Sequence, residues 1–187
     1  MFSVHSSYQE VITIINKGGV VVMPTDTIYG VVGSALQSET IERLYALRQR
    51  DPLKPVIILI GSLSQLKSFH VSLEPLVLPV LEQLWPGPTS VVLPCPHPEL
   101  AYLHRGGRSL AFRFPKKPEL LAMLAETGPV AAPSANPEGM APATTIQKAQ
   151  DYFNGRVDAY VDGGTLVGSA SRIVQMHPDG SYDVIRP

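Results

Sequence analysis

The sequence has little cysteine, no long apolar run and no excess of charge of one sign. Its single cysteine, Cys95, permits no internal disulfide and no cysteine-pair metal site, which indicates a reducing compartment. The N-terminus lacks a basic stretch followed by an apolar core, and no apolar run approaches membrane-spanning length. We therefore expect a cytoplasmic protein without membrane contact.

Charge of one sign is also missing, since 15 lysines and arginines nearly balance 16 aspartates and glutamates. This balance excludes a global basic field that would draw the chain onto nucleic acid, so any RNA contact would need a local patch.

The standard nucleotide-binding motifs are absent as well. The pairs Gly18-Gly19, Gly106-Gly107 and Gly163-Gly164 do not have the spacing of a dinucleotide fingerprint or of a Walker A loop. The five histidines are far apart in the sequence and lack ligand spacing, so we interpret them as solvated or capping residues. They are His5, His70, His97, His104 and His177.

What the chain does contain is typical of an ordinary globular domain. It has 187 residues, of which 44% are hydrophobic and 17% are charged. It is long enough to bury a sizeable core. We find no repeat, no low-complexity tract and no charge block, so we predict one domain over residues 1–187.

Helical and strand patterns alternate along the whole chain, which predicts an α/β fold. The expected helices cover 6–19 (ended by Gly18), 38–50 (capped by Ser38), 75–85, 117–127 and 144–153. The expected strands cover about 19–23, 55–60, 90–94, 109–115, 128–133, 158–164 and 171–176. Strict β-α-β alternation fails in the middle and at the C-terminus, so a mixed sheet is favoured over a Rossmann fold.

Polar residues follow several of these strands. In a sheet-based domain such residues converge on a crevice where ligands bind. They are Thr25, Asp26 and Thr27 in "PTDTIYG", Arg48, Arg50 and Lys54 in "RQRDPLKP", Arg113 in "SLAFRFP", Ser134 and Asn136 in "APSANPEG", and Ser171 with Arg172.

Each group taken singly has a purely structural interpretation. Thr-Asp-Thr can be only a turn, the basic cluster only a solvated helix end, and Ser-Ala-Asn only a helix cap. Taken together, several cations with hydroxyl and amide donors favour an anionic ligand, phosphate above all.

At these residues the sequence resembles the YrdC-like family, the threonylcarbamoyl-AMP synthases. The matching segments run from about Val11 to Arg186 and include "GGVVVMPTDTIYGVVGSA", "LRQRDPLKPVIILI", "LWPGPTSVVL", "SLAFRFP", "AAPSANPEG", "VDGG…GSASRIV" and "VIRP". The resemblance implies an open, twisted, mixed β-sheet with flanking helices and a positively charged concave cleft. It implies the short single-domain form, without the extra C-terminal domain of longer relatives.

The resemblance also implies an activity. L-threonine, bicarbonate and ATP would give threonylcarbamoyl-AMP and pyrophosphate, the intermediate for threonylcarbamoyladenosine at position 37 of ANN-decoding tRNAs. The chemistry needs no nucleophilic side chain, because positioning and electrostatics can carry it. A separate tRNA threonylcarbamoyl-transferase complex would use the product.

Residue roles follow from the same resemblance. Electrostatic stabilisation would come from Arg48, Arg50 and Lys54. Threonine would contact Thr27, Arg113, Ser134 and Ser171. ATP would contact Arg48, Arg50, Lys54, Ser109, Ser134, Asn136, Thr144 and Arg186. Magnesium is expected with ATP; Asp26 is the nearest acidic candidate, although we interpret it as the residue that shapes the turn carrying Thr25 and Thr27.

The chain departs from the family pattern at three places. Arg48 stands where lysine is usual, "SANPEG" replaces Ser-Ala-Asn-x-Ser-Gly, and Arg172 follows Ser171 where threonine is common. These differences affect the fine geometry of the nucleotide side, because arginine and lysine differ in donor geometry.

Three alternatives stand beside this hypothesis. A related carbamoyl-adenylate former of hydrogenase maturation carries cysteine-rich zinc modules, which a chain with one cysteine cannot supply. An RNA-binding or nucleotide-binding module of the same fold is the second alternative. A paralogue with another acceptor is the third.

Overall fold

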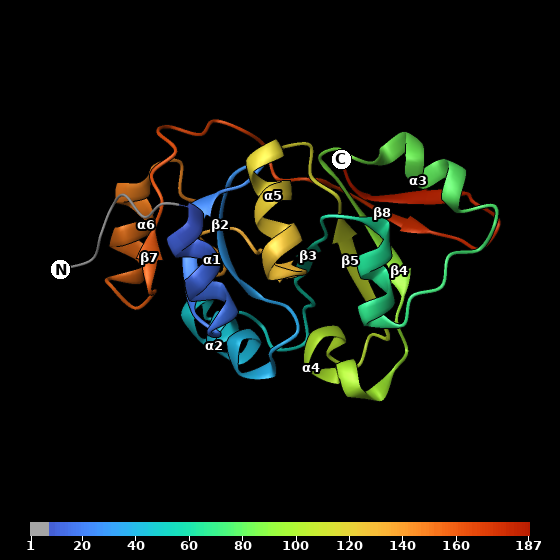
Figure 1. The fold of residues 1–187 in the computed structure, drawn as a ribbon, viewed down its shortest axis with the longest axis horizontal. Helices are drawn as coiled ribbons and strands as arrows, with labels where there is room; N and C mark the ends of the chain where they lie inside the picture. Colours follow the sequence, from blue (N-terminus) through green and yellow to red (C-terminus); the bar gives the residue numbers. More distant parts are fainter. Residues whose placement is uncertain (1–7) are drawn as a thin grey trace.

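The computed structural model describes residues 8–187. Within this range nine strands form one twisted sheet in the order β7-β1-β2-β6-β3-β5-β4-β8-β9, with helices on both faces (Figure 1). The strands are β1 (Val20–Pro24), β2 (Tyr29–Ser34), β3 (Ile57–Leu59), β4 (Thr89–Pro94), β5 (Ser109–Arg113), β6 (Val130–Ala131), β7 (Ala159–Tyr160), β8 (Arg172–Met176) and β9 (Tyr182–Arg186).

The sheet is mixed, which confirms the predicted fold class. Parallel pairs join β1 to β7, β3 to β5 and β4 to β8, and the remaining neighbours are antiparallel. The helices are α1 (Tyr8–Asn16), α2 (Ser38–Arg48), η1 (Leu63–Phe69), α3 (Leu78–Leu84), η2 (Pro98–Leu100), α4 (Ala101–His104), α5 (Pro118–Thr127) and α6 (Ile146–Phe153). No helix in the described range is long and apolar enough to cross a membrane.

Strand β1 explains why the sheet is covered on both faces. All five of its residues are buried. Val20 and Val22 belong to one hydrophobic cluster, while Val21 and Met23 belong to the other. Successive side chains of a strand point to opposite faces, so a continuous apolar run requires packing on each side. Helices α1 and α5 contribute to the cluster around Val21, and α2 and α6 to the cluster around Val20.

The sequence predicted most elements but misplaced some boundaries. Ser38 was expected to cap α2; instead it is the first helical residue, and Gln37 occupies the cap position without a side-chain hydrogen bond. The helix predicted over 75–85 begins at Leu78. The first helix was predicted from residue 6, and its first two residues, like His5, lie outside the described range.

Two strands were missed altogether. Strand β2 follows β1 after a short turn and carries two glycines, which weaken the strand pattern. Strand β9 is largely exposed at the sheet edge, so it lacks the apolar alternation of a half-buried strand.

Candidate functional site

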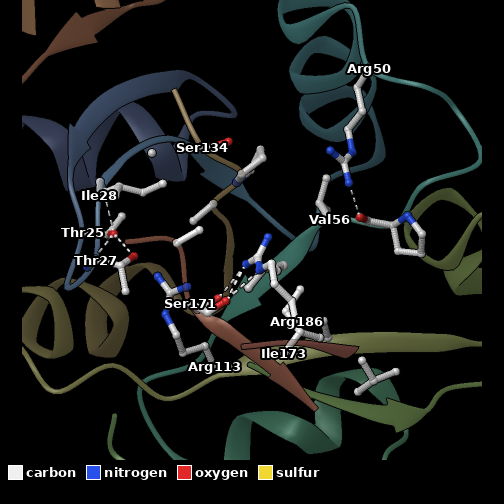
Figure 2. A pocket seen from close by; sticks show the side chains of 18 of the residues that line it. Thr25, Thr27, Ile28, Arg50, Val56, Arg113, Ser134, Ser171, Ile173 and Arg186 are labelled. Carbon is white, nitrogen blue, oxygen red and sulfur yellow. Dashed lines mark hydrogen bonds between the residues drawn. The ribbon is translucent and has the colours of Figure 1, made fainter. Parts of the chain in front are cut away.

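A cavity of about 310 Å³ is lined by one face of β5, by residues of β3, β4, β8 and β9 and by the turn between β1 and β2, and we call it the main cavity. Its volume lies within the range of about 300–1,000 Å³ that is usual for ligand sites. It is lined by Thr25, Thr27, Ile28, Tyr29, Gly30, Arg48, Arg50, Pro55, Val56, Ile57, Val92, Ser109, Ala111, Arg113, Ala132, Pro133, Ser134, Ala170, Ser171, Ile173, Ile185 and Arg186. Figure 2 shows side chains from widely separated segments facing this space.

The Thr-Asp-Thr segment forms the turn between β1 and β2. The Thr25 hydroxyl donates a hydrogen bond to the Ile28 carbonyl at 2.7 Å and accepts one from the Thr27 amide at 3.2 Å. The two threonine hydroxyls lie 3.1 Å apart (Figure 2). Thr25 therefore shapes the turn and places the Thr27 side chain on the wall of the cavity.

Asp26 has a different role from the one predicted. Its Oδ1 accepts a hydrogen bond from Nη2 of Arg113 at 2.9 Å, 87 positions away in the chain. The interpretation of Asp26 as the residue that shapes the turn was therefore wrong, because the hydroxyl of Thr25 closes the turn.

The ion pair between Asp26 and Arg113 is buried. The side chains are 6% and 3% exposed, respectively. Burial lowers the pKa of Arg113, and the charge of Asp26 opposes that shift. Asp26 Oδ2 and Arg113 Nε have no hydrogen-bond partner within the described residues. The pair thus retains hydrogen-bonding capacity next to the cavity.

Arg48 is also buried, and it lines the main cavity from the end of α2. Its Nε donates to the Asn136 carbonyl at 3.0 Å and its Nη2 to the Ser134 hydroxyl at 3.2 Å. Nη1 is buried and has no partner in the part of the chain described. Burial, followed by the charge of Arg50, lowers the pKa of Arg48 to about 10. The guanidinium is therefore still protonated at neutral pH, with one free nitrogen.

The other two basic residues of this segment differ in position. Arg50 lines the cavity and donates to the carbonyls of Lys54 at 3.1 Å and Pro55 at 2.7 Å. Lys54 is not part of the lining; its ammonium contacts Glu138 Oε1 at 2.5 Å, and Glu138 Oε2 accepts from the Asp51 amide at 2.5 Å. The hydrogen bond from Lys54 lowers the pKa of Glu138.

Strand β9 contributes Ile185 and Arg186 to the cavity wall. Nε and Nη2 of Arg186 both donate to the Ser171 carbonyl, at 2.9 and 2.6 Å (Figure 2). The buried Ser171 hydroxyl lies 2.8 Å from the Ser90 hydroxyl. Arg186 thus fixes the backbone of Ser171 while it faces the cavity.

Eight of the predicted site residues line the main cavity together: Thr27, Arg48, Arg50, Ser109, Arg113, Ser134, Ser171 and Arg186. Three do not, namely Lys54, Asn136 and Thr144. The amide of Asn136 is buried and donates to the carbonyls of Pro137 and Met140, both at 2.8 Å. Thr144 is exposed, and its carbonyl accepts from the Leu166 amide at 2.8 Å.

The apolar part of the wall was not predicted. It includes Ile28, Val56, Ile173 and Ile185. From sequence alone such residues are read as core, because only the fold shows which apolar side chains border a cavity. Tyr29 was also missed; its hydroxyl donates to the Gly164 carbonyl and accepts from the Gly163 amide, both at 2.8 Å.

The chain matches the family described as "Telomere recombination" (Sua5, YciO, YrdC) over residues 13–187. A threonylcarbamoyl-AMP synthase of Bacillus subtilis (strain 168) is 30% identical over 89% of this chain and 49% of its own length. The corresponding protein of Cellvibrio japonicus is 30% identical over 91% of this chain and 90% of its own length.

Solved structures agree with the sequence matches. Sua5 of P. abyssi, complexed with L-threonine, aligns with a TM-score of 0.86 and 27% identity over 96% of this chain and 53% of its own. YciO of E. coli, at 22% identity and a TM-score of 0.82, shares the fold. The chain spans about half the length of the Bacillus and P. abyssi proteins. The profile match covers nearly the whole chain, and the chain therefore belongs to the Sua5/YciO/YrdC family.

Proposed function

We propose that this chain is a threonylcarbamoyl-AMP synthase, a nucleotidyltransferase that converts L-threonine, bicarbonate and ATP into threonylcarbamoyl-AMP and pyrophosphate. The observation that carries the proposal is a cavity in which four arginines, Arg48, Arg50, Arg113 and Arg186, meet hydroxyl groups and an apolar wall. The names of the relatives support it. We further propose a cytoplasmic protein whose product passes to a separate tRNA threonylcarbamoyl-transferase complex.

The reaction brings together groups that repel each other. The amino group of threonine takes up bicarbonate with loss of water, and the resulting carboxylate attacks the α-phosphate of ATP as pyrophosphate leaves. Both reactants are anions, so the protein must neutralise them and hold them in line. Guanidinium groups are suited to this task because they bind carboxylate and phosphate oxygens with two donors each.

The threonine side of the site is formed by Arg113, Thr27, Ser134 and Ser171. Arg113 binds the carboxylate, and the hydroxyls orient the rest of the molecule. Asp26 makes this side selective for an amino acid, because its charge balances that of Arg113 and leaves the pair nearly neutral. A ligand with a carboxylate and a neighbouring amino group fits such a pair better than a dianion does.

The nucleotide side is formed by Arg48, Arg50, Ser109 and Arg186. The free Nη1 of Arg48 supplies a buried donor for a phosphate oxygen. Lys54 reaches the phosphates only after it leaves Glu138, and its exposed side chain allows this movement. Asn136 contributes through its carbonyl, which holds Arg48. Thr144, on the exposed loop before α6, would contact the nucleotide from outside the cavity lining.

Magnesium has no protein ligand in the cavity wall. Among residues 8–187 the lining includes no aspartate or glutamate, and Asp26, whose Oδ1 accepts from Arg113, is not a lining residue. The residues present therefore do not fit a protein-bound Mg²⁺ site, and we assign the ion no step.

An RNA-binding module is the alternative function. The cavity has a volume of about 310 Å³ and a partly apolar wall, and the chain has a formal net charge of −1, which supports a small-molecule site over an RNA groove. Tight tRNA association without ATP, falling steeply with salt, would support the alternative.

The test is an assay with purified protein, ATP, labelled bicarbonate and L-threonine. We expect pyrophosphate release that depends on threonine, together with a labelled adenylate. Turnover with another amine, or without any amine, would contradict the proposed acceptor and point to a paralogue.

A further inference from the structure

The fold brings together histidines that the sequence separates. Each of His70, His97 and Glu99 offers one ligand atom, and these three atoms all lie within 4.8 Å of one another. The imidazole rings of His70 and His97 are stacked with centroids 4.1 Å apart, and the second ring nitrogen of His70 (Nε2) contacts a carboxylate oxygen of Glu99. The interpretation of the histidines as solvated or capping residues agrees with the positions of His70 and His97 at the ends of η1 and η2, but the sequence did not predict that the two lie together.

We propose that His70, His97 and Glu99 form a binding site for a divalent transition-metal ion of the zinc type. Two imidazole nitrogens and one carboxylate oxygen are ligands that suit Zn²⁺, and three protein ligands leave a fourth position for water. Within residues 8–187 this is the one group of three such side chains with that proximity.

The backbone on both sides of the site is held by buried neighbours. Phe69, which precedes His70, is fully buried and packs edge to face against Phe112. The thiol of Cys95, two positions before His97, donates to the Phe69 carbonyl at 3.3 Å. The ligand-bearing segments therefore have a fixed separation, and binding need not order them.

The side chains themselves are free to adjust. Those of His70 and Glu99 are 46% and 63% exposed, so an ion can enter without opening the fold. In a tetrahedral site with bonds of about 2.1 Å, ligand atoms lie about 3.4 Å apart. The present separation of up to 4.8 Å closes to that value when the two rings turn out of their stacked arrangement.

The site is independent of the proposed reaction. None of the three residues lines the main cavity, so the ion would not serve ATP. The metal instead would cross-link the residue after η1 to the loop after β4, and thereby stabilise the native state over the unfolded one.

The test is calorimetric titration of the untagged protein with ZnCl₂, alongside melting curves with and without zinc. We expect one ion per chain and a rise in melting temperature. His97→Ala should weaken binding at least about 100-fold, because loss of even a group that only hydrogen-bonds a metal ligand costs about 10–100-fold. The variant should fold, because the hydrogen bonds at position 97 do not use the side chain. The backbone carbonyl of residue 97 accepts them from the Leu100 amide and from the His104 ring.

His177→Ala is the matched control, because His177 is an exposed histidine paired with Asp183 outside the cluster. It should bind zinc like the wild type. Absence of zinc binding, or equal loss in His97→Ala and His177→Ala, would overturn the proposal. Zinc-edge anomalous scattering from crystals should place the ion between the three side chains; an ion elsewhere would overturn it too.

Discussion

The buried pair of Asp26 and Arg113 is the residue-scale feature on which the proposed threonine side depends. Neither side chain is more than 6% exposed, so each charge relies on the other for compensation. Removing one member of a buried ion pair leaves an uncompensated charge in a poorly solvated place.

We therefore expect Asp26→Ala to lower the free energy of unfolding by about 3–5 kcal/mol. The double variant Asp26→Ala/Arg113→Ala should be more stable than Asp26→Ala, because no unpaired charge remains. Urea denaturation followed by circular dichroism measures both. Asp183→Ala, at an exposed pair, serves as control and should change stability by no more than about 0.5 kcal/mol. A loss below about 1 kcal/mol for Asp26→Ala would show that the pair is solvated.

Arg113 and Arg50 provide a test of the two sides of the main cavity. Arg113→Ala should reduce kcat/KM for threonine at least about 30-fold, the equivalent of about 2 kcal/mol for a lost charged contact. Arg50→Ala should raise the KM for ATP more than that for threonine. Steady-state pyrophosphate release with each substrate varied gives both values. If Arg113→Ala changed kcat/KM equally for threonine and for ATP, the assignment of Arg113 to the threonine side would be wrong.

At the scale of elements, the site depends on the loop between β7 and β8 packing against the β1–β2 turn. A Cβ added to Gly168 would lie 2.2 Å from the Thr27 carbonyl oxygen. Gly163 packs against Pro24 in a similar way. The loop can approach the turn this closely only because these positions lack side chains.

Gly168→Ala should therefore displace the turn that carries Thr27. We expect a loss of stability of about 1–3 kcal/mol, typical of overpacking, and a larger rise in KM for threonine than for ATP. Thermal melting and steady-state kinetics measure these effects. Val167→Ala, one residue earlier and 88% exposed, is the control and should behave like the wild type. Unchanged threonine kinetics in Gly168→Ala would mean that the position of Thr27 does not matter for binding.

At the scale of the whole molecule, local positive charge coexists with a formal net charge of −1. Four arginines lie in the cavity wall, and two of them are nearly buried. Burial lowers the pKa values of Arg48 and Arg113, because it removes water from their charged groups. A bound anion would compensate for that loss and stabilise the charged form of both arginines.

ATP should consequently stabilise the folded protein. At a ligand concentration of about 100 Kd the gain is about 2.7 kcal/mol, or about 5–10 °C in Tm for a chain of this size. Differential scanning fluorimetry with increasing ATP measures the shift. Arg48→Ala should diminish it, whereas His177→Ala should not. A tRNA-induced shift without an ATP-induced one would favour the RNA-binding alternative.

The element types and the family could be predicted because both are recognised from short stretches of neighbouring residues. The apolar run of β1, the stripe of α1 and the polar residues after the strands are all readable in order along the chain. Strands β2 and β9 were not predictable in this way. Two glycines interrupt the apolar pattern of β2, and β9 is largely exposed and so has no apolar alternation.

The sequence by itself thus determined the α/β class, the mixed sheet, the family and eight of the residues that line the main cavity. Only the tertiary structure decided that Asp26 pairs with Arg113, that Glu138 holds Lys54, and that His70 meets His97. These contacts join residues 27 to 87 positions apart. The reason is physical: periodicity and turn chemistry are local, whereas the partner of a charge depends on where the folded chain brings distant segments together.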